Sequence, residues 1–172
     1  YSCVIEEQGN YHLWYPTDGG LCYARSKDGI AWEKPNLGLA TFEGSRDNNI
    51  VLGNGAGGFT NVISSEGMIF LDPKASQAER FRYATRISDD YKHTAIFSSP
   101  DGIHWTLRGQ TLQSKDNTTM FYNPFRKVWV FSHRIHIQHA DGRYERARAY
   151  WESRDFFAAA GDAFIKQPPV FW

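Results

Sequence analysis

Apolar and polar positions alternate along most of the chain, and this pattern predicts an all-β protein. Short runs rich in aromatic and β-branched residues, such as 11–15, 81–86 and 128–134, are separated by clusters of Gly, Asp, Asn, Ser and Pro. Alternation with a period of two is typical of strands, and those clusters are typical of turns. Only two short segments, 74–79 and 156–163, have the composition of a helical turn.

A repeated unit orders the expected strands. Three strands end in Ser, one further residue and Asp, with the acids at Asp28, Asp101 and, in a looser copy, Asp155. Asp and Ser side chains stabilise tight turns, so we expect a structural Asp turn in each unit. An aromatic strand precedes each turn, and in the last two units it ends in an arginine, Arg86 or Arg134.

The spacing of these turns predicts the architecture. Asp28 and Asp101 are 73 residues apart, and Asp101 and Asp155 are 54 apart. A four-stranded propeller blade needs about 40 to 50 residues plus its loops. The longer interval fits if the Gly-rich stretch is an inserted loop. We therefore expect blade-like units at about 1–58, 59–115 and 116–172 within a single propeller domain.

Three such units are fewer than a closed propeller needs, since the smallest propellers have about four blades. The chain opens on Tyr1 rather than Met and closes on the apolar Trp172. We therefore expect an incomplete portion of a larger propeller.

Composition and charge narrow the classes of partner. The 172 residues include 19 Lys and Arg against 19 Asp and Glu, so the chain has no formal net charge. This balance removes the usual electrostatic case for nucleic acid or an anionic membrane surface. No apolar run approaches the roughly 18 residues of a membrane span. Cys3 and Cys22 are too far apart for a CxxC motif, which leaves one disulfide or two buried thiols open.

Four stretches carry a resemblance to a known group of enzymes: 26–39, 44–51, 116–124 and 146–155. They resemble the five-bladed β-propeller glycoside hydrolases, in particular uncharacterised proteins near families 32 and 43. The resemblance implies a five-bladed propeller, of which about three blades are present, and an oligo- or polysaccharide substrate. It implies no organic cofactor and leaves a structural Ca²⁺ and the oligomeric state open, while a secreted or periplasmic location is favoured.

The resemblance further implies hydrolysis by two carboxyl groups near the propeller axis. One carboxyl group protonates the leaving oxygen while the other acts as nucleophile or activates water, at roughly 5 Å or 6.5 to 9.5 Å separation. Asp116 is the first candidate because it precedes an expected innermost strand. Asp47 is the second, with an Asx turn as the alternative. Glu152 is the third, although the repeat aligns it with positions away from the axis.

Four further residues are candidates for binding substrate. Arg86 and Arg134 could hold a hydroxyl or carboxylate bidentately, or form a repeated structural ion pair. His133 could reach a pocket beside Arg134. Trp14 could stack on a sugar ring, or fill the space between blades. We expect no metal site, because His133 and His136 are three positions apart and therefore lie on opposite faces of a strand.

Two other functions remain open at this stage. The first is a catalytically silent carbohydrate-binding propeller, which would lack a complete acid pair. The second is a sialidase-like enzyme, because the SxDGxxW turns resemble the Asp box SxDxGxxW but lack one residue of it. The sequence GxGxxG at 53–58 is not followed by a helical pattern, so we do not expect nucleotide binding there.

Overall fold

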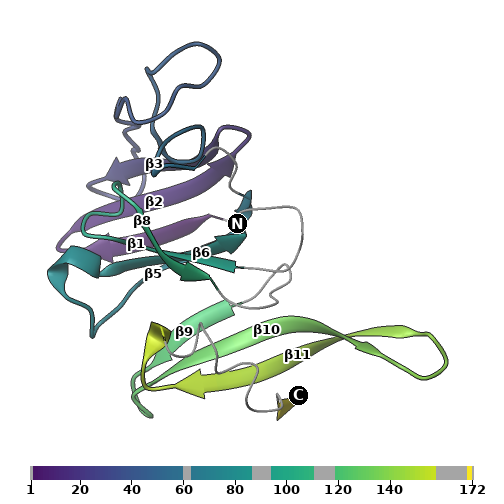
Figure 1. Ribbon diagram of the computed structural model, residues 1–172. Helices are drawn as coiled ribbons and strands as arrows, with labels where there is room; N and C mark the ends of the chain where they lie inside the picture. Colours follow the sequence, from purple (N-terminus) through teal and green to yellow (C-terminus); the bar gives the residue numbers. More distant parts are fainter. Residues whose placement is uncertain (1, 60–62, 87–93, 111–118, 158–169, 172) are drawn as a thin grey trace.

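The computed structural model describes residues 2–59, 63–86, 94–110, 119–157 and 170–171. Strands dominate these residues and form three four-stranded antiparallel sheets (Figure 1). The prediction of an all-β fold is therefore confirmed, and stacked antiparallel sheets of this kind are consistent with a β-propeller-like fold.

Each sheet is built from consecutive strands, and in each the strands stand side by side in chain order or its reverse. Sheet 1 contains β1 (Cys3–Glu7), β2 (Asn10–Thr17), β3 (Gly20–Ser26) and β4 (Ile50–Leu52). Sheet 2 contains β5 (Ile63–Leu71), β6 (Phe81–Arg86), β7 (Thr94–Ser99) and β8 (Thr106–Gln110), with the short 3₁₀ helix η1 (Gln77–Glu79) between its first two strands. Sheet 3 contains β9 (Thr119–Asn123), β10 (Val128–Gln138), β11 (Tyr144–Ser153) and β12 (Val170–Phe171).

The first three strands of every sheet pair in the same register. In each sheet, an aromatic residue of the second strand has two cross-strand neighbours. One is a residue of the first strand, and the other is the Ser of the Asp turn, on the third strand. These triplets are Glu6, Tyr11 and Ser26; Leu71, Phe81 and Ser99; and Tyr122, Trp129 and Ser153. Beside the Asp turns, the sequence repeat is therefore also a repeat of strand pairing, whereas the register of β5 with β6 shifts between Ile63 and Met68.

The Asp turns are alike in all three sheets. In sheet 1 the Asp28 carboxylate accepts the backbone N–H groups of Ile30 and Ala31, both at 2.8 Å. Asp101 accepts the N–H groups two and three residues on, at 2.9 and 2.8 Å, and Asp155 accepts the N–H two residues on, at 2.9 Å. The predicted structural role of these acids is confirmed. We call the end of the sheets that carries them the turn end, and the end at which β1, β5 and β9 begin the far end.

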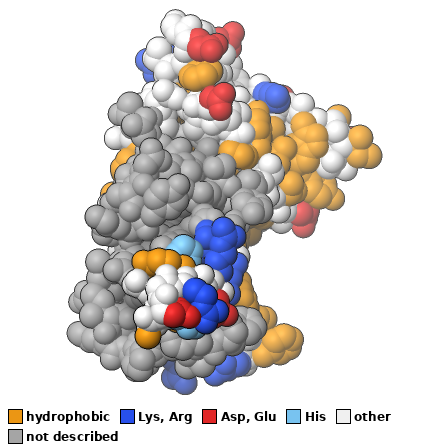
Figure 2. All heavy atoms as spheres, turned by 90° about the vertical axis from the view of Figure 1, so that its right-hand side faces the viewer, with side chains coloured by type: hydrophobic (Ala, Val, Ile, Leu, Met, Phe, Trp, Pro, Cys, Tyr) orange, Lys and Arg blue, Asp and Glu red, His pale blue; other side chains and the backbone are white. Residues whose placement is uncertain are grey.

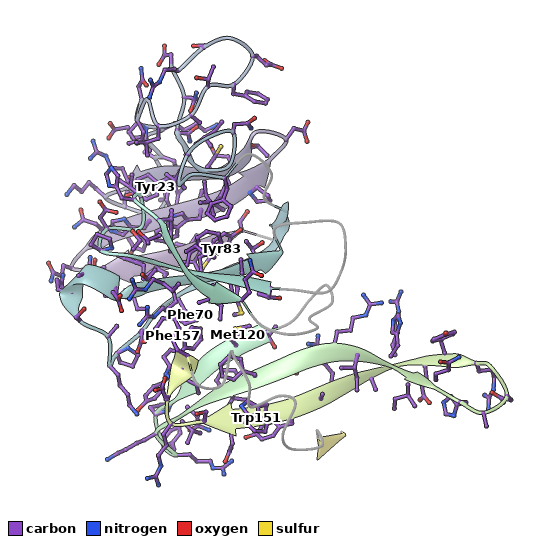
Figure 3. All side chains as sticks on the ribbon, in the orientation of Figure 1. Tyr23, Phe70, Tyr83, Met120, Trp151 and Phe157 are labelled. Carbon is purple, nitrogen blue, oxygen red and sulfur yellow. The ribbon has the colours of Figure 1, made fainter. Side chains whose placement is uncertain are left out.

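Sheet 2 lies between the other two sheets, because its side chains alternate between them. One set of faces forms a core with sheet 1 and includes Tyr23 and Tyr83, and the other forms a core with sheet 3 and includes Phe70 and Met120 (Figure 3). A period of two along β5, β6 and β7 sends neighbouring residues to opposite cores. Apolar packing on both faces of sheet 2 therefore holds the three sheets together.

The first strands of the three sheets are neighbours. β5 contacts both β1 and β9. The Cys3 thiol donates to the carbonyl oxygen of Ile69 at 3.0 Å, and the backbone N–H of Met120 donates to the Met68 sulfur at 3.0 Å. These contacts join the starts of β1 and β9 to the second half of β5. Cys3 and Cys22 are both free thiols, which decides the alternative left open by the sequence.

Candidate functional site

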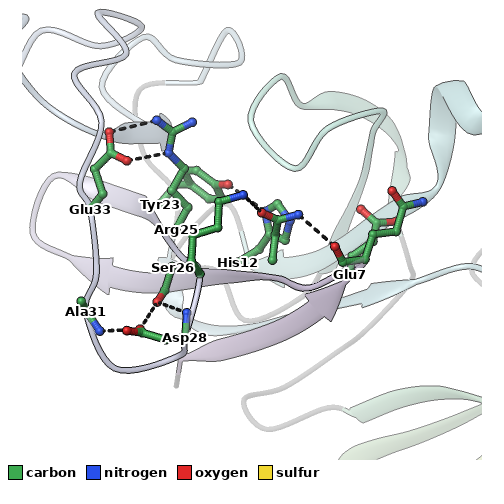
Figure 4. A pocket seen from close by; sticks show the side chains of 11 residues that line it. Glu7, His12, Tyr23, Arg25, Ser26, Asp28, Ala31 and Glu33 are labelled. Carbon is green, nitrogen blue, oxygen red and sulfur yellow. Dashed lines mark hydrogen bonds and ion pairs between the residues drawn. The ribbon is translucent and has the colours of Figure 1, made fainter.

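A hollow of about 640 Å³ opens at the turn end of sheet 1 (Figure 4). The end of β1, the start of β2, the end of β3 and the Asp28 turn surround it, and its polar side chains include His12, Lys27 and Glu33. This volume lies within the range of roughly 300 to 1,000 Å³ that is typical of small-molecule sites.

The charged groups of the hollow are held by partners. The Arg25 guanidinium donates to both oxygens of Glu33, with N–O distances of 2.9 Å each. The Lys27 ammonium donates to the Asn10 side-chain oxygen at 2.6 Å. Glu7 accepts two hydrogen bonds from Arg80, the residue directly before β6 of sheet 2. These contacts fix the polar lining in place, so the hollow presents an ordered set of donors and acceptors.

A histidine and a tyrosine form the inner wall of the hollow. The Nδ1 atom of His12 lies 2.7 Å from the Tyr23 hydroxyl oxygen. Burial lowers the pKa of His12, and the smaller effects of Glu7, which raises it, and Arg80, which lowers it, do not reverse that direction. The imidazole is therefore neutral at pH 7, and the pair can hydrogen-bond a neutral ligand.

Two carboxyl groups of the hollow are poorly suited to donate a proton. Hydrogen bonds from the backbone of Ile30 and Ala31 lower the pKa of Asp28, and the hydrogen bonds from Arg25 lower the pKa of Glu33. A general acid at neutral pH needs a raised pKa. The electrostatics at Asp28 and Glu33 therefore favour binding over proton transfer.

Of the three acids proposed from the sequence, the structure describes Asp47 and Glu152, and these two do not come together here. Asp116 lies outside the described residues. Asp47 is exposed in the loop before β4, with β2 and β3 between that strand and β1, and its N–H donates to the Ser45 hydroxyl at 3.0 Å. Glu152 lies on β11 at the turn end, where it accepts from Arg126 at 2.7 Å. Sheet 2 separates Asp47 from Glu152.

The predicted binding residues fall into two groups. Arg86 ends β6, and His133 and Arg134 lie on β10 opposite Ala149 and Arg148, so the backbones of all three lie toward the far end. The side chains of Arg86 and His133 are outside the part of the molecule that the structure describes.

Trp14 is the only member of the second group. It lies in the core between sheets 1 and 2. Its side chain is 1% exposed, and its indole N–H donates to the carbonyl oxygen of Gly102 at 2.7 Å. The ring is therefore covered by protein, which is the inter-blade alternative considered from the sequence.

Comparisons with known proteins add one structural likeness. No model of a protein family matches the chain, and no curated protein matches it. The chain is similar to the crystal structure of a glycosyl hydrolase from Bacteroides ovatus, with a TM-score of 0.45 and 16% identity. The match covers 88% of this chain and 47% of that one, so the chain spans about half the length of that structure. A likeness at this level fixes neither family nor activity.

Sequence reasoning did not find the hollow. Glu7 and Arg80 are 73 positions apart, and nothing local to either residue indicates that they pair. His12 carries one usable signal, since it is a titratable residue inside an aromatic strand. Among the described residues, no group of three or more His, Cys, Asp or Glu is placed to hold a metal ion. No helix in the described ranges is long and apolar enough to cross a membrane.

Proposed function

We propose that the chain is part of a five-bladed β-propeller glycoside hydrolase, similar to families 32 and 43, that cleaves a glycosidic bond of an oligo- or polysaccharide. The observation that carries this proposal is the shared register of the three sheets, with β1, β5 and β9 side by side. In a propeller, the first strands surround the central channel, where a substrate funnel forms. The sequence resemblance to sugar-acting propellers supports the same function.

We assign the first catalytic carboxyl group to Asp116. It precedes β9, the first strand of sheet 3, and that strand starts at the far end with β1 and β5. The hydrolysis needs one carboxyl group to protonate the leaving oxygen and a second to attack the sugar or activate water. Asp47 and Glu152 are ranked below Asp116, because one lies beside an outermost strand and the other is engaged by Arg126.

Arg86 and Arg134 are assigned to substrate binding in the same proposal. They occupy equivalent positions, each five residues after the aromatic residue of the shared register, Phe81 or Trp129. A guanidinium group can hold two oxygens of one sugar ring with a fixed geometry. His133, next to Arg134, is included in this group.

The test is hydrolysis of aryl glycosides by the full-length protein and by its Asp116→Asn variant. Loss of a catalytic carboxyl group is expected to lower kcat at least about 100-fold. Glu43→Gln is the control, since Glu43 is an exposed carboxylate in the loop before β4 and is not a candidate for the site, and we expect it to retain activity. Equal kcat for Asp116→Asn and the parent protein would remove Asp116 from the mechanism, provided that thermal unfolding shows both to be folded.

A second candidate is a carbohydrate-binding propeller without catalysis. The hollow favours it, because its polar groups are ordered by partners and His12 is neutral. Calorimetric titration with neutral oligosaccharides distinguishes the two functions. Binding without hydrolysis, weakened by His12→Ala, would support the binding protein, whereas hydrolysis that depends on Asp116 would support the enzyme.

A further inference from the structure

A two-stranded ribbon extends sheet 3 beyond its first strand. β9 pairs with β10 only as far as Thr119 opposite Ser132, whereas β10 and β11 continue to pair as far as Gln138 opposite Tyr144. We call residues 133–149 the ribbon. In Figure 1 it projects from the far end, past the strands of the other two sheets.

One face of the ribbon is rich in cationic side chains. Residues that lie directly opposite each other share a face, and alternate residues along each strand do the same. We call this set the cationic face: Arg134 opposite Arg148, His136 opposite Arg146, and Gln138 opposite Tyr144. None of these six positions holds Asp or Glu. The Arg148 guanidinium donates to the carbonyl oxygen of Ser132 at 3.0 Å, and a nitrogen of the Arg134 guanidinium lies 3.2 Å from the Nε2 atom of His136.

The acids of the ribbon are engaged with other residues. Asp141 accepts from Arg143 at the tip, with an N–O distance of 2.7 Å, and Glu145 lies 2.9 Å from the His139 ring nitrogen. Arg146 is exposed and forms no ion pair with any residue in the described ranges. Figure 2, which views the molecule from the ribbon side, shows Lys or Arg side chains next to a His side chain there.

The zero net charge of the chain conceals a strong gradient. Residues 3–52, which contain sheet 1, have four Lys and Arg against seven Asp and Glu. Residues 119–153, which contain β9, β10 and β11, have six Lys and Arg against three Asp and Glu. The positive charge is therefore gathered in the sheet that carries the ribbon, which attracts anions to it.

We propose that the cationic face binds the oxyanion groups of an acidic polysaccharide, either uronate carboxylates or sulfate esters. Planar guanidinium groups match the two oxygens of such groups. The Arg134–Arg148 pair and the His136–Arg146 pair are two residues apart along the strands, or about 7 Å, so they can hold successive groups on one chain. The inference rests on the proposed function in one respect, namely that the ligand is a saccharide. It adds that this saccharide is acidic.

The test is calorimetric titration of the full-length protein with three oligosaccharides of equal length: one of uronate units, one sulfated and one neutral. Arg146→Gln removes an exposed charge from the cationic face, and we expect it to weaken binding of an acidic oligosaccharide about tenfold, as loss of one charge-assisted hydrogen bond predicts. Added salt weakens the acidic complex by screening. Whichever acidic oligosaccharide binds more tightly identifies the oxyanion.

Arg143→Gln is the matched control. Arg143 is on the same hairpin, but it is paired with Asp141 and lies outside the cationic face. Equal binding of the neutral and acidic oligosaccharides, or an equal loss in both variants, overturns the proposal. Single-stranded DNA that binds as tightly and with the same dependence on Arg146 overturns the saccharide assignment. Asp116→Asn is scored by hydrolysis and Arg146→Gln by acidic binding, each in its own assay, so the two proposals fail separately.

Discussion

Sheets 1 and 3 share one backbone plan and differ in length and charge. Both have the same register around their Asp turns, yet β2 and β3 have 8 and 7 residues, whereas β10 and β11 have 11 and 10. Sheet 1 carries an excess of acids and a hollow at the turn end, whereas sheet 3 carries an excess of cations and a ribbon at the far end. The repeat therefore supplies the framework, and strand length and charge differentiate the sheets.

The contact between sheet 1 and sheet 2 gives the largest expected effect. Trp14→Ala removes a side chain that is 1% exposed and leaves the Gly102 carbonyl without its donor. We expect a loss of about 3 to 5 kcal/mol in the free energy of unfolding, as large-to-small core changes cost. Urea unfolding of the full-length protein measures it.

Phe125 of sheet 3 is the control for that comparison. Its ring is 95% exposed in the turn between β9 and β10. Phe125→Ala should change the free energy of unfolding by less than about 0.5 kcal/mol, the range of surface substitutions. Equal losses in the two variants would contradict the assignment of Trp14 to the core.

A smaller effect on the free energy of unfolding is expected at the Asp101 turn, whose Gly102 carbonyl oxygen accepts the hydrogen bond from Trp14. Burial raises the pKa of Asp101, but hydrogen bonds from His104, Ile103 and Ser99 outweigh it and hold the pKa at about 2. A lowered pKa in the folded state stabilises the protein above the ordinary value near 3.8, and this stabilisation is lost as the pH falls toward 2. Because Asp101 is partly exposed, we expect Asp101→Asn to cost about 1 kcal/mol at pH 7 and to remove that part of the acid dependence.

Hydrogen exchange can show whether the loss of stability in Asp101→Asn falls on sheet 1 or on sheet 3. The Asp101 turn carries Gly102, the acceptor for Trp14 of β2, so Asp101→Asn should lower protection in β2. Among the described residues, no hydrogen bond joins β10 of sheet 3 to that turn, so protection in β10 should stay unchanged. An equal loss of protection in β2 and β10 would contradict this prediction, because it would show that the turn stabilises both sheets alike.

The smallest effect is expected at the exposed ion pair of the hollow. Arg25 and Glu33 are 57% and 61% exposed, and exposed ion pairs contribute little to stability because water and salt screen them. Arg25→Gln should leave the unfolding midpoint unchanged within error. If the hollow binds a neutral saccharide, the same variant should weaken that binding in a calorimetric titration, whereas Arg143→Gln on the ribbon should not.

Much of the framework could be predicted because its determinants are local. The Asp turns depend on Ser and Asp side chains that bond backbone groups two or three residues away, so Asp28 and Asp101 identify their own turns. The equivalence of Arg86 and Arg134 follows from counting along a strand after an aromatic residue. Trp14 could be either a sugar-stacking residue or a core residue by its sequence, and its ring is buried, since strand aromatics fill the space between sheets.

The candidate sites could not be predicted to the same extent. The hollow depends on Glu7 and Arg80, which only the packing of sheet 1 on sheet 2 brings into contact. The sequence points to Arg134 as a single residue. That Arg148 lies directly opposite it follows only from the pairing of β10 with β11. A shift of one residue in that register would move Arg148 to the other face.

The sequence by itself determined the all-β class, the repeat and the turns, because period-two patterning and Asp turns act over a few residues. Tertiary structure decided which groups share a face. Strand register and sheet stacking join positions that are tens of residues apart, as the thiol of Cys3 and the carbonyl of Ile69 illustrate. The separation of an acidic sheet with a hollow from a cationic sheet with a ribbon exists only once those strands are paired.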